Sequence, residues 1–261
     1  MYNFVRSDGK CIILAFDHGG LGMVGFDDPR PVLEAATSNG VDAVLSTWGV
    51  IKNFRSSMGR SGVMLRVDNT VSIHAGYEER PGSCIDLELA ARRLGIDGAM
   101  CMGMTKHFID GTSAEGESLQ LLSRVVQDCD ELGLVAAVEM LPNFFSEDPA
   151  DSDEESMRVA CRVASEIGAD LIKTRFTTDN FANVARNSFA PIVALGGAYT
   201  EDTRSTLQYV RDAMDAGCIG IAMGRNIHGR PVKEIPSFVR ALDLIVHQDA
   251  SVDDAMKVID F

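Results

Sequence analysis

The chain of 261 residues lacks the long apolar runs of a membrane protein. No stretch approaches the roughly 18 consecutive apolar residues that a membrane-spanning helix needs, and residues 1–10 contain no apolar core of the kind found in signal peptides. The six cysteines include no Cys-x-x-Cys pair, and several lie inside apolar runs, as buried free thiols do. We therefore expect a cytoplasmic protein in a reducing compartment, with no membrane partner.

Basic residues are scarce relative to acidic ones. The sequence has 24 Lys and Arg residues against 38 Asp and Glu residues, which gives a formal net charge of -14. A surface of this charge repels nucleic acid and anionic membranes, so neither is expected as a partner. An anionic small-molecule substrate would have to bind at a local positive site.

A short pattern recurs along the chain: a helix-like segment, a glycine, and then a strand of about five residues. The glycine suits the left-handed residue that commonly follows the end of a helix. The continuous apolar character of the strands indicates a parallel sheet covered on both faces. The eight expected strands lie at or within residues 11–16, 39–45, 61–67, 94–100, 132–138, 167–173, 191–195 and 216–222.

Eight such units of about 30 residues fit a barrel better than a doubly wound sheet. We predict the α/β fold class, with a single (β/α)8 TIM barrel domain over residues 1–261 and extra C-terminal helices near 235–247 and 251–259. Other helices are expected at 31–38, at 83–94, from a capping box at 152–155 to Ile167, and from a cap at Thr200 or Asp202 to Ala216.

Ionisable residues stand at the ends of four expected strands, where the active sites of such barrels lie. Side chains alternate in direction along a strand, so each of these residues shares a face with apolar or small residues deeper in its strand. If those faces point inward, the side chains converge on one cavity: Asp17, Asp68, Glu139 and Lys173, with Arg66 on the same face as Asp68. Each carboxylate alone would equally fit a helix cap or a surface loop.

Lys173 lies near the end of the apolar run at residues 169–174, Ala-Asp-Leu-Ile-Lys-Thr. Burial disfavours the ammonium form of a lysine, and the free amine can attack a carbonyl group to form an imine. The alternative is a lysine at the end of a strand whose head reaches water.

Glycine-rich turns end the last two expected strands. Residues 195–200 and 222–226 each end a strand with glycine and then open a helix. Backbone amides that are not shielded by a Cβ atom, together with a nearby arginine, would bind a phosphate dianion. Two plain tight turns are the alternative. The expected phosphate-binding residues are Gly196, Gly197, Ala198, Gly224 and Arg225.

Four stretches resemble a known family, at residues 15–19, 169–174, 195–197 and 221–227. They are similar to class I aldolases, the family that includes archaeal-type fructose-bisphosphate aldolase, tagatose-bisphosphate aldolase and the autoinducer-2 phosphate thiolase. The resemblance implies a Schiff-base lysine at Lys173, a catalytic or substrate-orienting Asp17, and phosphate binding at the two glycine turns. It also implies a homo-oligomer and no metal or other cofactor.

Two positions depart from the pattern of the archaeal-type members. Leu141 stands where those members tend to have an acid/base tyrosine, and Tyr199 stands in a turn that often carries a lysine. Glu139 resembles instead the strand glutamate of tagatose-bisphosphate aldolases, so the acid/base role is assigned to it.

The sequence thus predicts a class I aldolase, a carbon-carbon lyase, that acts through Lys173 on a phosphorylated ketose or related keto phosphate. Asp17 and Glu139 would move protons, while Arg66, Asp68 and His18 would contact the substrate. Transaldolase-like or thiolase-like transfer at the same site stays open, as does a sugar-phosphate-binding barrel without catalysis. A metal-dependent aldolase would need spatial assembly of histidines that lack the close spacing of a zinc site: His18, His74, His107, His228 and His247.

Overall fold

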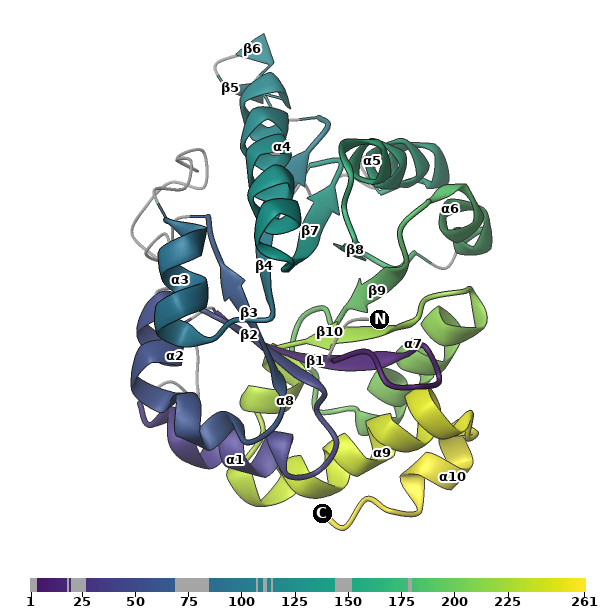
Figure 1. The fold of residues 1–261 in the computed structure, drawn as a ribbon. Coiled ribbons are helices and arrows are strands. Elements are labelled where there is room, and N and C mark those ends of the chain that lie inside the picture. The colour runs from purple at the N-terminus through teal and green to yellow at the C-terminus, as the bar shows by residue number, and fades with distance from the viewer. Residues whose placement is uncertain are drawn as a thin grey trace.

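The computed structural model describes residues 4–17, 19, 27–68, 85–106, 108–109, 112–113, 115–143, 152–177 and 180–261. Eight parallel strands close into a barrel in the order β1-β10-β9-β8-β7-β4-β3-β2 (Figure 1). Their bounds are β1 Cys11–Phe16, β2 Ala43–Ser46, β3 Gly62–Arg66, β4 Gly98–Met104, β7 Val135–Leu141, β8 Leu171–Thr174, β9 Ile192–Leu195 and β10 Gly220–Met223. The TIM barrel predicted from the repeats is confirmed.

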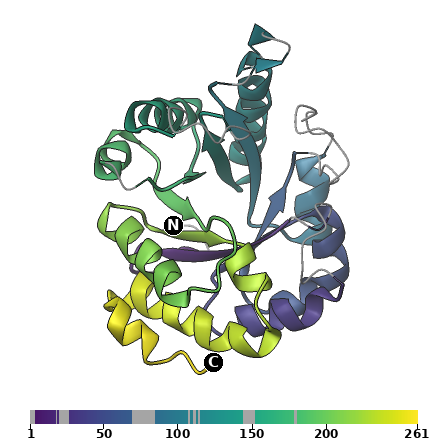
Figure 2. The ribbon, with the colours of Figure 1, turned by 180° about the vertical axis from the view of Figure 1, so that it is seen from behind.

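Helices surround the barrel, as the front and back views show (Figures 1 and 2). They are α1 Pro29–Thr37, α2 Trp48–Phe54, α3 Leu87–Leu94, α4 Glu115–Leu132, α5 Glu154–Ile167, α6 Phe181–Asn187, α7 Thr203–Asp215, α8 Arg225–His228, α9 Ile235–Gln248 and α10 Val252–Met256. A small antiparallel pair, β5 Phe108–Ile109 and β6 Thr112–Ser113, lies beyond the start of α4. Within the described ranges, no helix is both long and apolar enough to cross a membrane.

Some helix boundaries differ from the sequence-based expectation. The cap of α5 is Asp153, which accepts a hydrogen bond from the Ser156 amide at 2.8 Å, rather than Ser152. The Ser152 hydroxyl instead accepts a hydrogen bond from Arg175. Of the two candidate caps for α7, Asp202 is the one that accepts the Ser205 amide, at 3.0 Å.

Two further helices are shorter than expected. Helix α3 begins at Leu87, after its cap Asp86, and α10 ends at Met256. Helices α3 and α5 end, as expected, with glycine in the left-handed conformation, at Gly95 and Gly168.

Two apolar clusters divide the core. The larger contains outward-facing strand residues packed against the helices. The second contains no residue from a helix, so it fills the interior of the barrel; its strand members are Cys11, Ile13, Ala15, Ala43, Leu45, Met64, Met100, Val135, Ala137, Leu171, Val193 and Ala222. The inward faces predicted for β1, β3, β7 and β8 are therefore confirmed. Phe4 joins this cluster, and a Cβ atom on Gly62 would lie only 2.7 Å from the Phe4 Cβ.

The described cysteines are buried and free: Cys11, Cys101, Cys129, Cys161 and Cys218. Burial raises the pKa of the Cys161 thiol to about 12. Such a thiol stays protonated and unreactive at neutral pH. This agrees with the expectation of buried free thiols for this part of the chain, and Cys84 lies outside it.

Side chains at both ends of the strands tie neighbouring strands together. At the amino-terminal end, three aspartates that directly precede strands accept a backbone N–H from the adjacent strand: Asp42 from Ile12 at 2.7 Å, Asp97 from Val63 at 2.8 Å, and Asp170 from Ala136 at 2.8 Å. At the carboxyl end, hydroxyl groups donate to the preceding strand: Ser46 to the Phe16 carbonyl and Thr174 to the Met140 carbonyl, both at 2.6 Å. These contacts help to fix the register on which the site depends.

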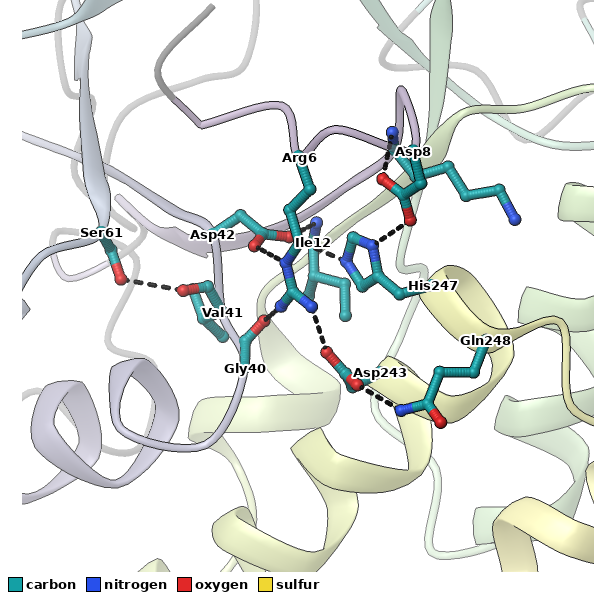
Figure 3. A network of polar contacts seen from close by, with 11 residues as sticks. Arg6, Asp8, Ile12, Gly40, Val41, Asp42, Ser61, Asp243, His247 and Gln248 are labelled. Atoms are coloured by element: carbon teal, nitrogen blue, oxygen red, sulfur yellow. Dashed lines mark hydrogen bonds and ion pairs between the residues drawn. The ribbon is translucent and has the colours of Figure 1, made fainter.

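A polar network joins the segment before β1 to helix α9 (Figure 3). Arg6 pairs with Asp42 at 2.5 Å and with Asp243 at 2.7 Å. The buried His247 ring lies between two carboxylates, with Nδ1 2.8 Å from Asp8 and Nε2 3.0 Å from Asp42. Burial lowers the pKa of His247, but hydrogen bonds to Asp42 and Asp8 outweigh it, so the pKa of the imidazole is raised.

This network predicts a pH-dependent contribution to stability. Because the folded-state pKa of His247 is raised, its contribution is fully present below the unfolded value of about 6.5 and is lost as the pH rises through the folded value. Denaturant unfolding of wild type and His247→Gln across this pH range measures it. We expect the advantage of wild type to shrink as the pH rises, and an advantage that stays constant would contradict the prediction.

Candidate active site

Five ionisable side chains meet at the carboxyl ends of four strands. Asp17 follows β1, Arg66 ends β3 with Asp68 two residues later, Glu139 lies in β7, and Lys173 lies in β8. The Glu139 residue is 5% exposed and Lys173 is 3% exposed, and the side chains of the other three are also largely buried. The structure thus brings together all five of the residues that the sequence placed on inward faces, Arg66 included.

Glu139 bridges the two cations of this cluster. Its Oε1 lies 3.0 Å from Nζ of Lys173, and its Oε2 accepts a hydrogen bond from Nη1 of Arg66 at 2.7 Å. Glu139 and Lys173 are also register partners in the parallel pair β7 and β8. Strand pairing therefore places the carboxylate beside the amine, because both side chains point into the barrel.

Arg66 lies among the three carboxylates of the cluster. Its Nε lies 2.8 Å from Oδ2 of Asp68 and 3.6 Å from Oδ2 of Asp17. The other oxygen of Asp68 accepts the Met102 amide at 2.9 Å. Burial lowers the pKa of Arg66, but the charges of the three carboxylates outweigh it, so the pKa of the guanidinium is raised. Arg66 is a fixed positive charge in the site.

The same balance sets the charge of Glu139. Burial raises the pKa of its carboxyl group, but the charges of Lys173 and Arg66 and the hydrogen bonds that they donate lower it further. The net pKa lies well below the ordinary value for glutamate. Glu139 is therefore a carboxylate in the resting site.

The position of Lys173 is supported by its neighbour on the opposite face of β8. Thr174 points outward, and its hydroxyl donates to the Met140 carbonyl of β7. Met140 directly follows Glu139. This hydrogen bond fastens β8 to β7 one residue beyond the pair Glu139 and Lys173, so it restrains the backbone that carries both groups.

The two glycine turns lie side by side, because β9 and β10 are neighbours in the barrel. A Cβ atom on Gly196 would lie 2.7 Å from Cγ of Met223, and one on Gly224 would lie 2.7 Å from the Ala15 carbonyl oxygen. Gly197 has a positive φ of 67°. The turns therefore need glycine for close packing and for backbone conformation. Arg225, the next residue after Gly224, is exposed.

Asn226 was not among the site residues predicted from the sequence. It is 2% exposed, and its Nδ2 donates to the carbonyls of Gly196 at 2.9 Å and Ala198 at 2.7 Å. Its Oδ1 accepts the Thr200 amide at 3.0 Å. Asn226 thus fixes the shape of the β9 turn from α8. The sequence signals were its place just inside a predicted helix and within the stretch 221–227 that resembles the aldolase family.

Other expected residues lie elsewhere or outside the described ranges. His18, His74 and His107 fall outside them. The His228 ring packs edge-on against Phe16, with centroids 5.7 Å apart, and His247 belongs to the network of Figure 3. Among the described residues, no three His, Cys, Asp or Glu side chains are grouped so as to hold a metal ion.

The two residues that depart from the family pattern, Leu141 and Tyr199, differ in their exposure to solvent. Leu141 is the last residue of β7 and is buried, so the end of this strand carries an apolar side chain. Tyr199 is exposed in the turn after β9. Of these two side chains, only that of Tyr199 is accessible to solvent.

Comparisons with known proteins show the family to which the chain belongs. Residues 11–230 match the DeoC/LacD family of aldolases. The chain is 31% identical to a 2-amino-3,7-dideoxy-D-threo-hept-6-ulosonate synthase of Halobacterium salinarum, over 97% of this chain and 93% of that protein. It is 27% identical to a class 1 fructose-bisphosphate aldolase of the same species, over 97% and 96% of the two chains.

The chain is also similar to a solved structure of an archaeal enzyme. It is an archaeal fructose-1,6-bisphosphate aldolase with its catalytic lysine covalently bound to the carbinolamine intermediate of the substrate. The TM-score is 0.79 at 25% identity, and the match covers 93% of this chain and 96% of that one. The chain therefore belongs to the DeoC/LacD aldolase family and is an enzyme of the class I type, whose members work through a lysine Schiff base.

Proposed function

We propose that Lys173 is the Schiff-base lysine of this enzyme and that its substrate is a phosphorylated ketose or a related keto phosphate. The observation that supports the assignment is the position of Nζ, inside a closed barrel and 3.0 Å from the Glu139 carboxylate. An amine must lose its proton before it attacks a ketone. Glu139, which is ionised, is the carboxylate placed to accept that proton.

The first half of the reaction builds the electron sink. The neutral amine of Lys173 attacks the ketone carbon, and the resulting carbinolamine loses water once its hydroxyl is protonated, leaving an iminium ion. Asp17 and Glu139 carry protons in these steps, each contributing about 10²- to 10⁴-fold. Arg66 holds the carboxylates in place and neutralises part of their charge.

The second half of the reaction breaks or forms the carbon-carbon bond. In cleavage, a base removes the proton of the hydroxyl group on the leaving carbon, and the bond electrons pass into the iminium to give an enamine. The aldehyde leaves, the enamine is protonated, and water releases the ketone from Lys173. Condensation follows the same steps in reverse. The iminium supplies the electron sink, so we propose a metal-independent mechanism.

The phosphate group of the substrate is assigned to the two glycine turns. Their backbones approach closely where a Cβ atom would clash, and Arg225 offers an exposed positive charge beside them. Tyr199 stands in a turn where the family often has a lysine. We therefore assign the positive charge at these turns to Arg225. Arg66 and Asp68 are proposed to orient the rest of the substrate.

The two named relatives carry out different reactions, so the proposal names a class of substrate rather than one compound. One is a synthase of a dideoxyheptulosonate and another is a fructose-bisphosphate aldolase. The proposal is therefore a class of substrate, keto phosphates, with aldol chemistry in either direction. We further propose a homo-oligomer of single-domain chains acting in the cytoplasm on small molecules.

Reductive trapping tests the imine. Dihydroxyacetone phosphate with sodium borohydride should attach covalently to the peptide that carries Lys173, as peptide mass spectrometry would show, because borohydride reduces an iminium to a stable amine. Lys173→Met should lose the adduct and at least about 10³-fold in kcat. The exposed Lys257→Met is the matched control and should keep both. Absence of an adduct with every phosphorylated ketone tried would remove the imine mechanism.

Glu139→Gln tests the proton acceptor. The amide keeps the shape of the side chain but loses its charge, so kcat should fall by about 10²- to 10⁴-fold. Circular dichroism and thermal unfolding must show a folded protein, because the change also leaves Arg66 and Lys173 less well paired. The exposed Glu166→Gln on α5 should behave as wild type. A kcat within about 2-fold of wild type for Glu139→Gln would assign the proton transfer elsewhere.

A further inference from the structure

Arg230 is a buried arginine that follows α8 and is 4% exposed. Its Nε donates to the Asn226 carbonyl at 2.8 Å, and its Nη1 lies 3.1 Å from the Thr203 hydroxyl. Both acceptors are neutral groups. In the part of the chain that the structure describes, Arg230 makes no ion pair with a carboxylate, and its Nη2 has no hydrogen-bond partner.

The surroundings of the guanidinium are largely aromatic. It lies over the Phe238 ring at 3.9 Å, and the Phe261 ring is 5.5 Å away. Burial lowers the pKa of Arg230, and the electrostatic contributions of Tyr199 and Glu234 only partly oppose this. Rings relieve part of the cost of burying a cation, but they do not replace a counter-ion.

Three other arginines of the described residues each pair with two or more carboxylates. Arg66 has three carboxylates, Arg6 pairs with two aspartates, and Arg211 pairs with Asp215 and Asp249. A buried positive charge without a carboxylate destabilises the folded chain unless an anion balances it. Arg230 differs from these three arginines, and an anionic ligand would balance its charge.

Hydrogen bonds connect Arg230 to the turn after β9. Arg230 binds the backbone of Asn226, and the Asn226 side chain binds Gly196, Ala198 and Thr200 of that turn. Its second contact, Thr203, is the first residue of the helix into which the turn leads. Arg230 is thus not part of the turn, but it contacts Asn226, which holds the turn, and Thr203, which follows it.

We propose that Arg230 is a positioning residue of the anion site: it holds the turn through Asn226, and its uncompensated charge is balanced by the phosphate group bound there. The charge acts through a layer of buried protein, where screening by water is weak. The proposal rests on the assignment of the phosphate to the glycine turns and extends it from Arg225 to a buried second cation.

Arg230→Met tests the charge while keeping an unbranched, apolar side chain. Titration calorimetry with inorganic phosphate, at constant ionic strength, should show binding weakened by about 10-fold or more. KM for the keto phosphate should rise by a similar factor, with kcat nearly unchanged. The melting temperature without phosphate should stay the same or rise, because no carboxylate loses its partner. Arg230→Lys, which restores the charge, should recover part of the phosphate affinity.

Arg211→Met is the matched control. It removes an arginine that has its own carboxylates, so phosphate affinity should not change. If Arg230→Met binds phosphate as wild type does, the proposal is wrong. It is also wrong if Arg230→Met lowers the melting temperature and weakens phosphate binding together, and Arg230→Lys restores neither. A purely structural role of Arg230 predicts that result. Failure of wild type itself to bind phosphate would overturn the phosphate assignment as well, which separates the two failures.

Discussion

The contact on which the site depends is the pairing of Glu139 with Lys173 and Arg66 inside the barrel. Removing charges from water is costly, and their attraction offsets that cost only when the geometry is good. Here one carboxylate faces two cations at 3.0 and 2.7 Å. The arrangement keeps Glu139 ionised and holds the Lys173 side chain at one place. By our proposal, these two groups are the proton acceptor and the imine-forming lysine.

Strand register makes that contact possible. The aspartates at the start of the strands and the hydroxyls at their ends each bind a neighbouring strand. A slip of one residue would turn Lys173 outward and Ile172 inward, because side chains alternate. Thr174 fastens β8 to β7 right beside the pair Glu139 and Lys173, so a hydroxyl on the outer face of the strand restrains the position of two side chains on the inner face.

Two arginines, Arg66 and Arg230, place positive charge in different surroundings. Arg66 is surrounded by carboxylates, and its charge serves to organise them. Arg230 has none among the described residues, and its charge is directed by our proposal to an incoming anion. The glycine turns lie at the ends of the neighbouring strands β9 and β10. By our proposal, the carbonyl group of a keto phosphate reacts with Lys173 and its phosphate dianion binds at these turns.

The barrel, the inward faces and the convergence of Asp17, Glu139 and Lys173 could be predicted from the sequence, because these follow from local periodicity and from where strands end. Only the tertiary structure decided the partners. Arg66 and Glu139 are 73 residues apart in the chain, and barrel closure makes them neighbours. Likewise, the contacts of Asn226, and the lack of a carboxylate partner for Arg230 among the described residues, depend on what packs against these side chains, which no local pattern encodes.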